Sequence, residues 1–153
     1  MSDGTVFPYG ITFREDGVVD IFPAAQVFFH YKNGGEVQFF LLIDSGAHIS
    51  VLPRADAEPL GIKIEDGKHT LIVGISGTFV RGWRHDISVR LGENRIKLPF
   101  VFIDDDNAPR VLGRAGIFDK FSIVFEESKR RTAFLQNNSK EVGAVSKILS
   151  RIS

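Results

Sequence analysis

The segment FFLLIDSGAHISVLP (residues 39–53) places an aspartate directly after a run of large apolar residues. The run Phe39 to Ile43 is too continuous for a half-exposed strand, so it predicts a strand that is covered on both faces. Asp44 is therefore expected where water is scarce, and a carboxylate in such a place is neutralised, is paired or takes part in a reaction. Ser45 and Gly46 favour a sharp turn that exposes the carboxylate oxygens.

Composition predicts one globular domain. The chain has 153 residues, 43% of them hydrophobic, and its 19 basic and 19 acidic residues cancel, which argues against a nucleic-acid partner. It has no cysteine, so neither disulfides nor thiolate metal sites are expected, which fits a reducing compartment. Residues 1–10 lack the features of a signal peptide, and no apolar run is long enough to span a bilayer. We expect a cytoplasmic protein with no membrane partner.

Fourteen phenylalanines and repeated glycine-containing turns indicate an all-β fold. Three hairpins are predicted over residues 11–22, 27–43 and 69–83, with turns at Asp16-Gly17, Asn33 to Gly35 and Gly74 to Gly77. The remaining elements expected are strands near Asp86 to Leu91, Lys97 to Ile103 and Ser122 to Phe125, a short apolar strand leading into Gly113, a link at 53–62, and a helical segment from Arg114 to Phe121.

The C-terminal segment has a different pattern. Residues 1–135 are expected to form the domain, with the first hairpin as an N-terminal extension, and residues 136–153 a linker followed by an amphipathic helix. Val142, Val145, Leu149 and Ile152 are spaced three or four apart, as on one face of a helix. The sequence leaves open whether this stripe docks on the domain or contacts a partner.

With these elements placed, the chain resembles the retropepsin-like aspartic proteases, single-domain relatives of retroviral proteases that act as homodimers. Three motifs carry the resemblance, which covers the chain from Val37 to Glu126. Asp44, Ser45, Gly46 and Ala47 are similar to the catalytic loop, Val73, Gly74, Ile75, Ser76 and Gly77 to the glycine-rich flap, and Val111, Leu112, Gly113 and Arg114 to the motif that lies beside the catalytic loop. The resemblance implies a closed β-barrel with one short helix near its C-terminal end.

The same resemblance implies an aspartic endopeptidase that hydrolyses extended polypeptide segments without a cofactor. The chemistry needs two carboxylates and the chain has one such loop, so Asp44 of each subunit must meet at a homodimer axis and activate a water there. By the resemblance, Ser45 links the two loops, and Gly46 and Ala47 hold the substrate backbone. The flap around Ile75 closes over the peptide, for which Gly74 and Gly77 are expected to supply backbone freedom, with positive φ at Gly74.

Two positions depart from the family pattern. Many relatives continue the last motif with Asn or Asp and begin a helix there, whereas this chain has Ala115-Gly116. In retroviral members an aspartate follows the catalytic loop and pairs with the motif's arginine, but His48 stands at that position here. Arg114 is therefore expected either to pair with one of the aspartates from Asp104 to Asp106 or to face solvent.

The sequence evidence for other types of functional site is weaker. The histidines at 30, 48, 69 and 85 lack metal-ligand spacing, so no metal is expected. Residues 104–108, DDDNA, begin like a calcium loop but are not followed by its glycine and glutamate. The alternative function is a non-catalytic peptide-binding or dimerisation module on the same fold. The intact Asp44-Ser45-Gly46 favours the enzyme, because a binding module gains nothing evident from a buried carboxylate.

Overall fold

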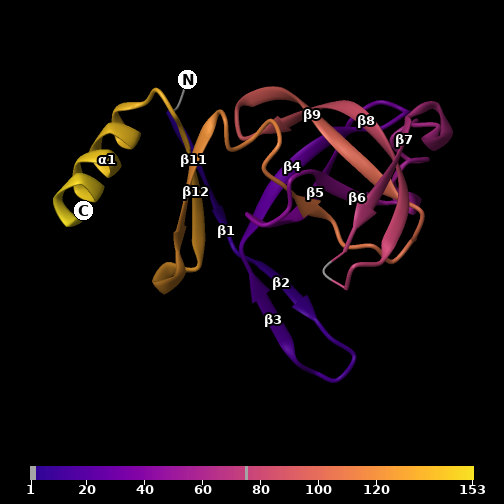
Figure 1. Ribbon diagram of the computed structural model, residues 1–153, viewed down its shortest axis with the longest axis horizontal. Helices are drawn as coiled ribbons and strands as arrows, with labels where there is room; N and C mark the ends of the chain where they lie inside the picture. The colour runs from indigo at the N-terminus through magenta and orange to yellow at the C-terminus, as the bar shows by residue number, and fades with distance from the viewer. Residues whose placement is uncertain (1–2, 75) are drawn as a thin grey trace.

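The computed structural model describes residues 3–74 and 76–153, and its body is one seven-stranded sheet. The sheet has the order β4-β5-β10-β6-β9-β8-β7, and a further antiparallel pairing of β4 with β8 closes it into a ring (Figure 1). Its strands are β4 (Ala24–His30), β5 (Glu36–Ile43), β6 (Ser50–Pro53), β7 (Lys68–Val73), β8 (Phe79–Leu91), β9 (Asn94–Ile103) and β10 (Val111–Leu112). The all-β prediction is confirmed.

Strand β5 shows how the ring builds its core. Phe39, Leu41 and Ile43 are buried, whereas Phe40 on the opposite face is 49% exposed and Leu42 is half-buried. Successive side chains of a strand point to opposite faces, so one face of β5 packs in the core and the other is only partly covered. The prediction of full cover on both faces was therefore wrong for the outward face.

A second, three-stranded sheet packs beside the ring and joins the two ends of the chain. It consists of β1 (Gly4–Pro8), β12 (Arg131–Gln136) and β11 (Phe121–Glu126), in that order. On its inner side Phe7 and Phe134 are buried, with ring centroids 5.4 Å apart. Only β11 corresponds to a predicted strand. Strand β1 pairs with β12 from the other end of the chain, whereas β12 also pairs locally with β11 and was not predicted.

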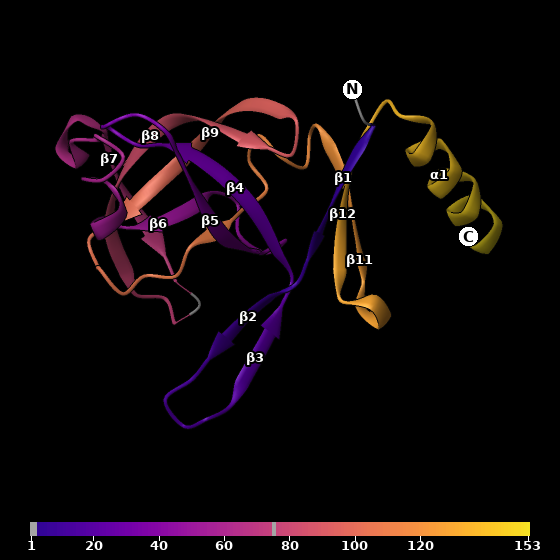
Figure 2. The same cartoon turned by 180° about the vertical axis from the view of Figure 1, so that it is seen from behind.

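The N-terminal hairpin is a separate two-stranded sheet of β2 (Gly10–Phe13) and β3 (Val19–Phe22). It projects from the body in both views (Figures 1 and 2). Gly17 has φ +79° in its turn, which agrees with the turn predicted at Asp16-Gly17. Ile11 and Phe13 remain 59% and 80% exposed, so the hairpin keeps apolar surface outside the core.

Two predicted elements differ from the structure. The strand expected at Asp86 to Leu91 is the second half of the 13-residue β8. The helical segment expected from Arg114 to Phe121 is a series of turns, in which Phe118 N donates to the carbonyl of Arg114 at 3.0 Å. Gly116 has φ +77°, a left-handed conformation that interrupts a helix. The link at 53–62 contains a short 3₁₀ helix, η1 (Arg54–Asp56), and a second, η2 (Ile64–Asp66), follows it.

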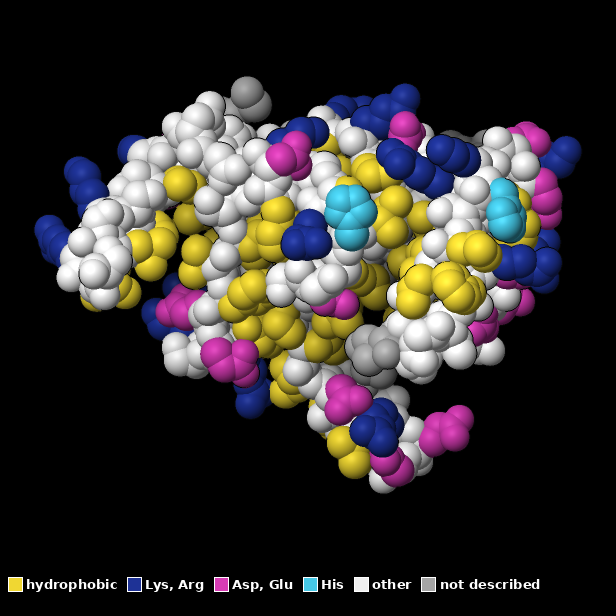
Figure 3. Space-filling view, viewed as in Figure 1, with side chains coloured by type: hydrophobic (Ala, Val, Ile, Leu, Met, Phe, Trp, Pro, Cys, Tyr) yellow, Lys and Arg dark blue, Asp and Glu magenta, His cyan; other side chains and the backbone are white. Residues whose placement is uncertain are grey.

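The predicted C-terminal helix is confirmed as α1 (Lys140–Ile152). The Ser139 hydroxyl accepts a hydrogen bond from Val142 N at 3.3 Å and caps its first turn. Val142 and Val145 are half-buried, but Leu149 and Ile152 are 56% and 78% exposed. The stripe thus docks only near the start of α1, and apolar side chains stay visible along the helix (Figure 3). None of the described helices has the length and apolar character needed to cross a membrane.

Candidate functional site

Asp44 follows directly on the last residue of β5. Its N–H donates to the carbonyl of Leu112 at 3.0 Å, and its carboxylate Oδ1 accepts a hydrogen bond from Gly46 N at 2.9 Å. The turn closes with Ala47 N donating to the Asp44 carbonyl at 3.2 Å. Asp44 is half-buried, while Ser45 and Gly46 are exposed. The turn therefore holds the carboxylate at the protein surface instead of enclosing it in the core.

Strand β10 brings a distant segment beside this loop. It pairs in parallel with β5, with Leu112 opposite Ile43. Beyond the strand the two segments stay in contact, since Arg114 N donates to the carbonyl of Ala47 at 3.0 Å and Ala115 N to that of His48 at 2.8 Å. The Asp-Ser-Gly-Ala and Val-Leu-Gly-Arg motifs are thus joined by backbone hydrogen bonds.

Gly113 is the point of closest approach between the two segments. A Cβ on it would lie 2.6 Å from the carbonyl carbon and oxygen of Ile49, a distance that side chains do not tolerate. Its N–H donates to the hydroxyl of Ser50 at 3.0 Å, and Ser50 is fully buried. Sequence reasoning missed Ser50, although a hydroxyl at the start of the apolar stretch Ser50 to Pro53 was a signal for a buried hydrogen bond.

Arg114 is exposed and shares a shallow surface hollow with His48. Asp104, one of its expected partners, instead pairs with Arg54 at 2.7 Å and with Arg81 at 3.6 Å. Within the described ranges Arg114 forms no ion pair, so the second of the two expected outcomes, exposure to solvent, holds in the single protomer.

A second arginine, Arg110, anchors the segment that enters β10. Its guanidinium donates to both carboxylate oxygens of Asp56, at 2.7 and 2.8 Å, and lies 4.3 Å from the ring centre of Phe39. The hydrogen bonds to Asp56 raise the pKa of Arg110, although burial acts in the opposite direction. The Arg110 carbonyl accepts from Leu42 N at 2.9 Å, so this ion pair supports the strand that leads to Asp44. Sequence reasoning did not identify it.

The glycine-rich segment lies at the tip of the β7–β8 hairpin, which projects from the ring (Figure 1). Gly74 N donates to the carbonyl of Thr78 at 3.0 Å, and Gly77 N to that of Gly74 at 2.9 Å. Gly77 has φ +76°, but Gly74 is not in the left-handed region, so the expectation of positive φ at Gly74 was wrong. Ile75 lies outside the described residues. Ser76 shares a 2.7 Å hydroxyl–hydroxyl hydrogen bond with Thr78.

One face of this hairpin is apolar and open. Leu71 and Val73 are two residues apart on β7, so their side chains point to the same side of the hairpin, and Phe79 on β8 pairs with Val73. These three side chains are 54%, 58% and 69% exposed. Among residues 3–74 and 76–153, no hydrogen bond links the hairpin tip to residues 44–47.

The described part of the chain contains no group of three or more His, Cys, Asp or Glu side chains placed to hold a metal ion.

An all-β ring with an Asp-Ser-Gly turn at the end of a core strand is the arrangement expected of an aspartic protease. Comparison with known proteins agrees with this class. The model of a family described as aspartyl protease matches residues 30–115, so the chain belongs to the aspartyl protease family. None of the curated protein sequences compared with the chain matches it significantly.

The solved structures that are similar to this chain include the following two. A retropepsin-like aspartic protease from Rickettsia conorii superposes with a TM-score of 0.57 at 18% identity, covering 87% of this chain and 99% of that one. EIAV protease complexed with the inhibitor HBY-793 has a TM-score of 0.46 at 25% identity, covering 60% of this chain and 81% of that one. The first likeness shows that the fold is retropepsin-like.

Proposed function

We propose that this protein is an aspartic endopeptidase whose active site forms at a homodimer axis from Asp44 of each subunit. The observation that carries the proposal is the position of Asp44, on an exposed turn whose backbone is held by β10 and Gly113. Membership of the aspartyl protease family supports this reading.

The need for two chains follows from the sequence. It contains one Asp-Ser-Gly motif, and proteolysis of this type uses two carboxyl groups about 3 Å apart. A two-fold axis at the turn would bring the second carboxyl from an identical chain. Ser45 and Gly46 are exposed, so both are accessible to a partner's loop.

At such an axis the paired carboxyls share one proton, because two adjacent negative charges repel. The ionised member accepts a proton from a water as that water attacks the peptide carbonyl. The protonated member donates to the developing oxyanion, and protons then pass to the leaving amine. In this scheme Ser45 links the two loops, while Gly46 and Ala47 hold the substrate backbone.

The β7–β8 hairpin serves as the flap in this proposal, with Val73 to Gly77 at its tip. Its exposed face of Leu71, Val73 and Phe79 suits extended substrates with apolar side chains next to the scissile bond. Closure of this face over a bound peptide would exclude water from the reacting carboxyls. The absence of cysteine fits work in a reducing compartment such as the cytoplasm.

The test is digestion of a proteome-derived peptide library by the wild type and by Asp44→Asn, across pH. The amide has the carboxylate's shape but cannot accept the water's proton, so Asp44→Asn is expected to fold and to lose all cleavage. Asp66→Asn is the matched control, because it removes an exposed carboxylate on η2, outside the candidate site. Peptide binding without cleavage by the wild type would instead support the non-catalytic alternative.

A further inference from the structure

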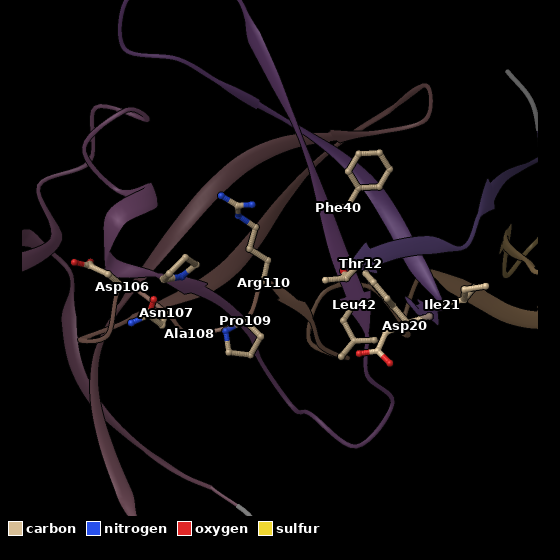
Figure 4. A pocket seen from close by; sticks show the side chains of 12 residues that line it. Thr12, Asp20, Ile21, Phe40, Leu42, Asp106, Asn107, Ala108, Pro109 and Arg110 are labelled. Atoms are coloured by element: carbon tan, nitrogen blue, oxygen red, sulfur yellow. The ribbon is translucent and has the colours of Figure 1, made fainter. Parts of the chain in front are cut away.

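A groove of about 710 Å³ lies on the outward face of β5, between the β2–β3 hairpin and the loop at 104–110. Its floor and walls are largely apolar and include Ile21, Phe40, Leu42 and Pro109. Figure 4 shows Asp106 at one end of the groove and Asp20 near the other, with Arg110 and Pro109 between them.

The groove includes Leu42, which stands two residues before the candidate catalytic Asp44 in the chain. Phe40 and Leu42 are two residues apart on β5, so by strand periodicity their side chains lie toward the same side, and Asp44 follows directly after the strand. Leu42 also marks the place where β5 meets the loop, since Leu42 N donates to the Arg110 carbonyl at 2.9 Å. An extended peptide that leaves the Asp44 loop along β5 would therefore enter the groove.

One wall of the groove lies outside the segment that the family model matches. The β2–β3 hairpin ends at Phe22, whereas the family match begins at residue 30. The hairpin contributes Asp20 and Ile21 to the lining.

The charges of the groove favour a cation. The guanidinium of Arg110 is occupied by both oxygens of Asp56. Among the described residues, the one ion-pair partner of Asp20 is Arg14 at 3.9 Å, and both side chains are about half exposed. Asp106 forms no ion pair in the same part of the chain, although its charge acts on Arg54. The groove thus offers two accessible carboxylates beside an apolar floor.

We propose that this groove extends the substrate cleft and binds a Lys or Arg side chain of the peptide substrate. The methylene stem would cover Phe40 and Leu42, and the charged end would meet Asp20 or Asp106. The inference rests on the proposed peptidase function and adds to it a basic residue at one position beyond the apolar residues that flank the scissile bond.

The experiment compares cleavage of a proteome-derived peptide library by the wild type, Asp20→Asn, Asp106→Asn and the control Asp66→Asn. Cleaved peptides from the wild type and the control should be enriched in Lys or Arg at one position. On a peptide chosen from that set, kcat/KM should fall about two- to fivefold in Asp20→Asn or Asp106→Asn, the size typical of an exposed ion pair. Replacement of the basic residue by norleucine should remove the difference between variant and wild type.

Cleavage by the wild type without any basic preference would overturn the groove assignment and leave the peptidase proposal intact. If the wild type cleaves nothing, the peptidase proposal fails, and peptide binding then tests the groove assignment. Fluorescence anisotropy would then compare two degenerate decapeptide pools, one with a central arginine and one with norleucine. The groove assignment would be supported if the arginine pool binds more tightly than the norleucine pool and if Asp106→Asn or Asp20→Asn weakens that binding. Equal binding of the two pools would reject the assignment. A change in dimer dissociation in these variants, without a change in peptide preference, would also reject it, because the groove would then be an interface between copies.

Discussion

Gly113 and Ile49 are in backbone contact, and a side chain on Gly113 would overlap the Ile49 carbonyl, with a Cβ 2.6 Å from its carbon and oxygen. This contact packs the end of β10 under the loop that carries Asp44. The position of the candidate catalytic carboxylate therefore depends on the absence of a single methyl group 69 residues further along the chain (113 minus 44).

Gly113→Ala should lower stability by about 1–3 kcal/mol, the range for overpacking a close-packed site, and should lower proteolysis by shifting the Asp44 loop. Urea unfolding and peptide turnover measure the two effects. Gly143→Ala is the control, because a Cβ there meets nothing within 4 Å and alanine favours the helix. A Gly113→Ala protein as stable and active as the wild type would show that the contact is not constraining.

Ser50→Ala should also destabilise the protein, by about 1–3 kcal/mol, because it leaves the buried Gly113 N–H without its 3.0 Å acceptor. The midpoint of urea unfolding gives the change. Ser150→Ala removes a hydroxyl that bonds to the Ser146 carbonyl on the exposed side of α1, and we expect almost no change there. Equal stability of Ser50→Ala and the wild type would contradict the role given to this hydrogen bond.

Activity should depend on protein concentration if each active site uses two chains. Specific activity is expected to fall on dilution below the dimer dissociation constant. Excess Asp44→Asn chain, mixed with the wild type, should suppress activity by forming dimers with one functional carboxyl. A protein that sediments as a monomer and keeps full specific activity at every dilution would defeat the two-chain site.

Gly77→Val should reduce peptide turnover more than Gly74→Val. Gly77 has φ +76°, which a β-branched residue strongly resists, whereas a Cβ on Gly74 meets nothing closer than 3.8 Å. Steady-state kinetics on one peptide would compare the two variants, with circular dichroism and sedimentation to check fold and assembly. If both turn over substrate at the wild-type rate, this hairpin is not the flap.

Stability should decrease in acid partly through Glu36. Its carboxylate accepts from Arg90 Nη2 at 2.7 Å, and this hydrogen bond lowers the pKa of Glu36 in the folded protein. A lowered pKa contributes stability above the ordinary glutamate pKa, and this contribution is lost as pH falls through the folded value. Urea midpoints between pH 7 and pH 3 should therefore fall less steeply for Glu36→Gln than for the wild type; parallel curves would count against the linkage.

Much of this protein was predictable from local sequence patterns. The apolar run before Asp44 predicts a core strand that ends in a turn, and the hairpin turn at Gly17 and the helix α1 follow from turn chemistry and from a three-to-four-residue apolar spacing. These features depend on residues that are neighbours along the chain, so their cause is visible in the sequence itself.

Other features were decided only by tertiary structure. The strands β1 and β12 pair the two ends of the chain, Ser50 bonds to Gly113, and Arg110 pairs with Asp56, all between segments more than 50 residues apart. None of these residues shows its partner in the local sequence, and only the folded chain brings each one to its contact. Strand periodicity likewise could not show that the outward face of β5 stays partly open, because the hairpin and loop that border it come from elsewhere in the chain. Local patterns thus determined the elements and the order of the motifs, whereas long-range packing determined how the Asp44 turn is held and what surrounds it.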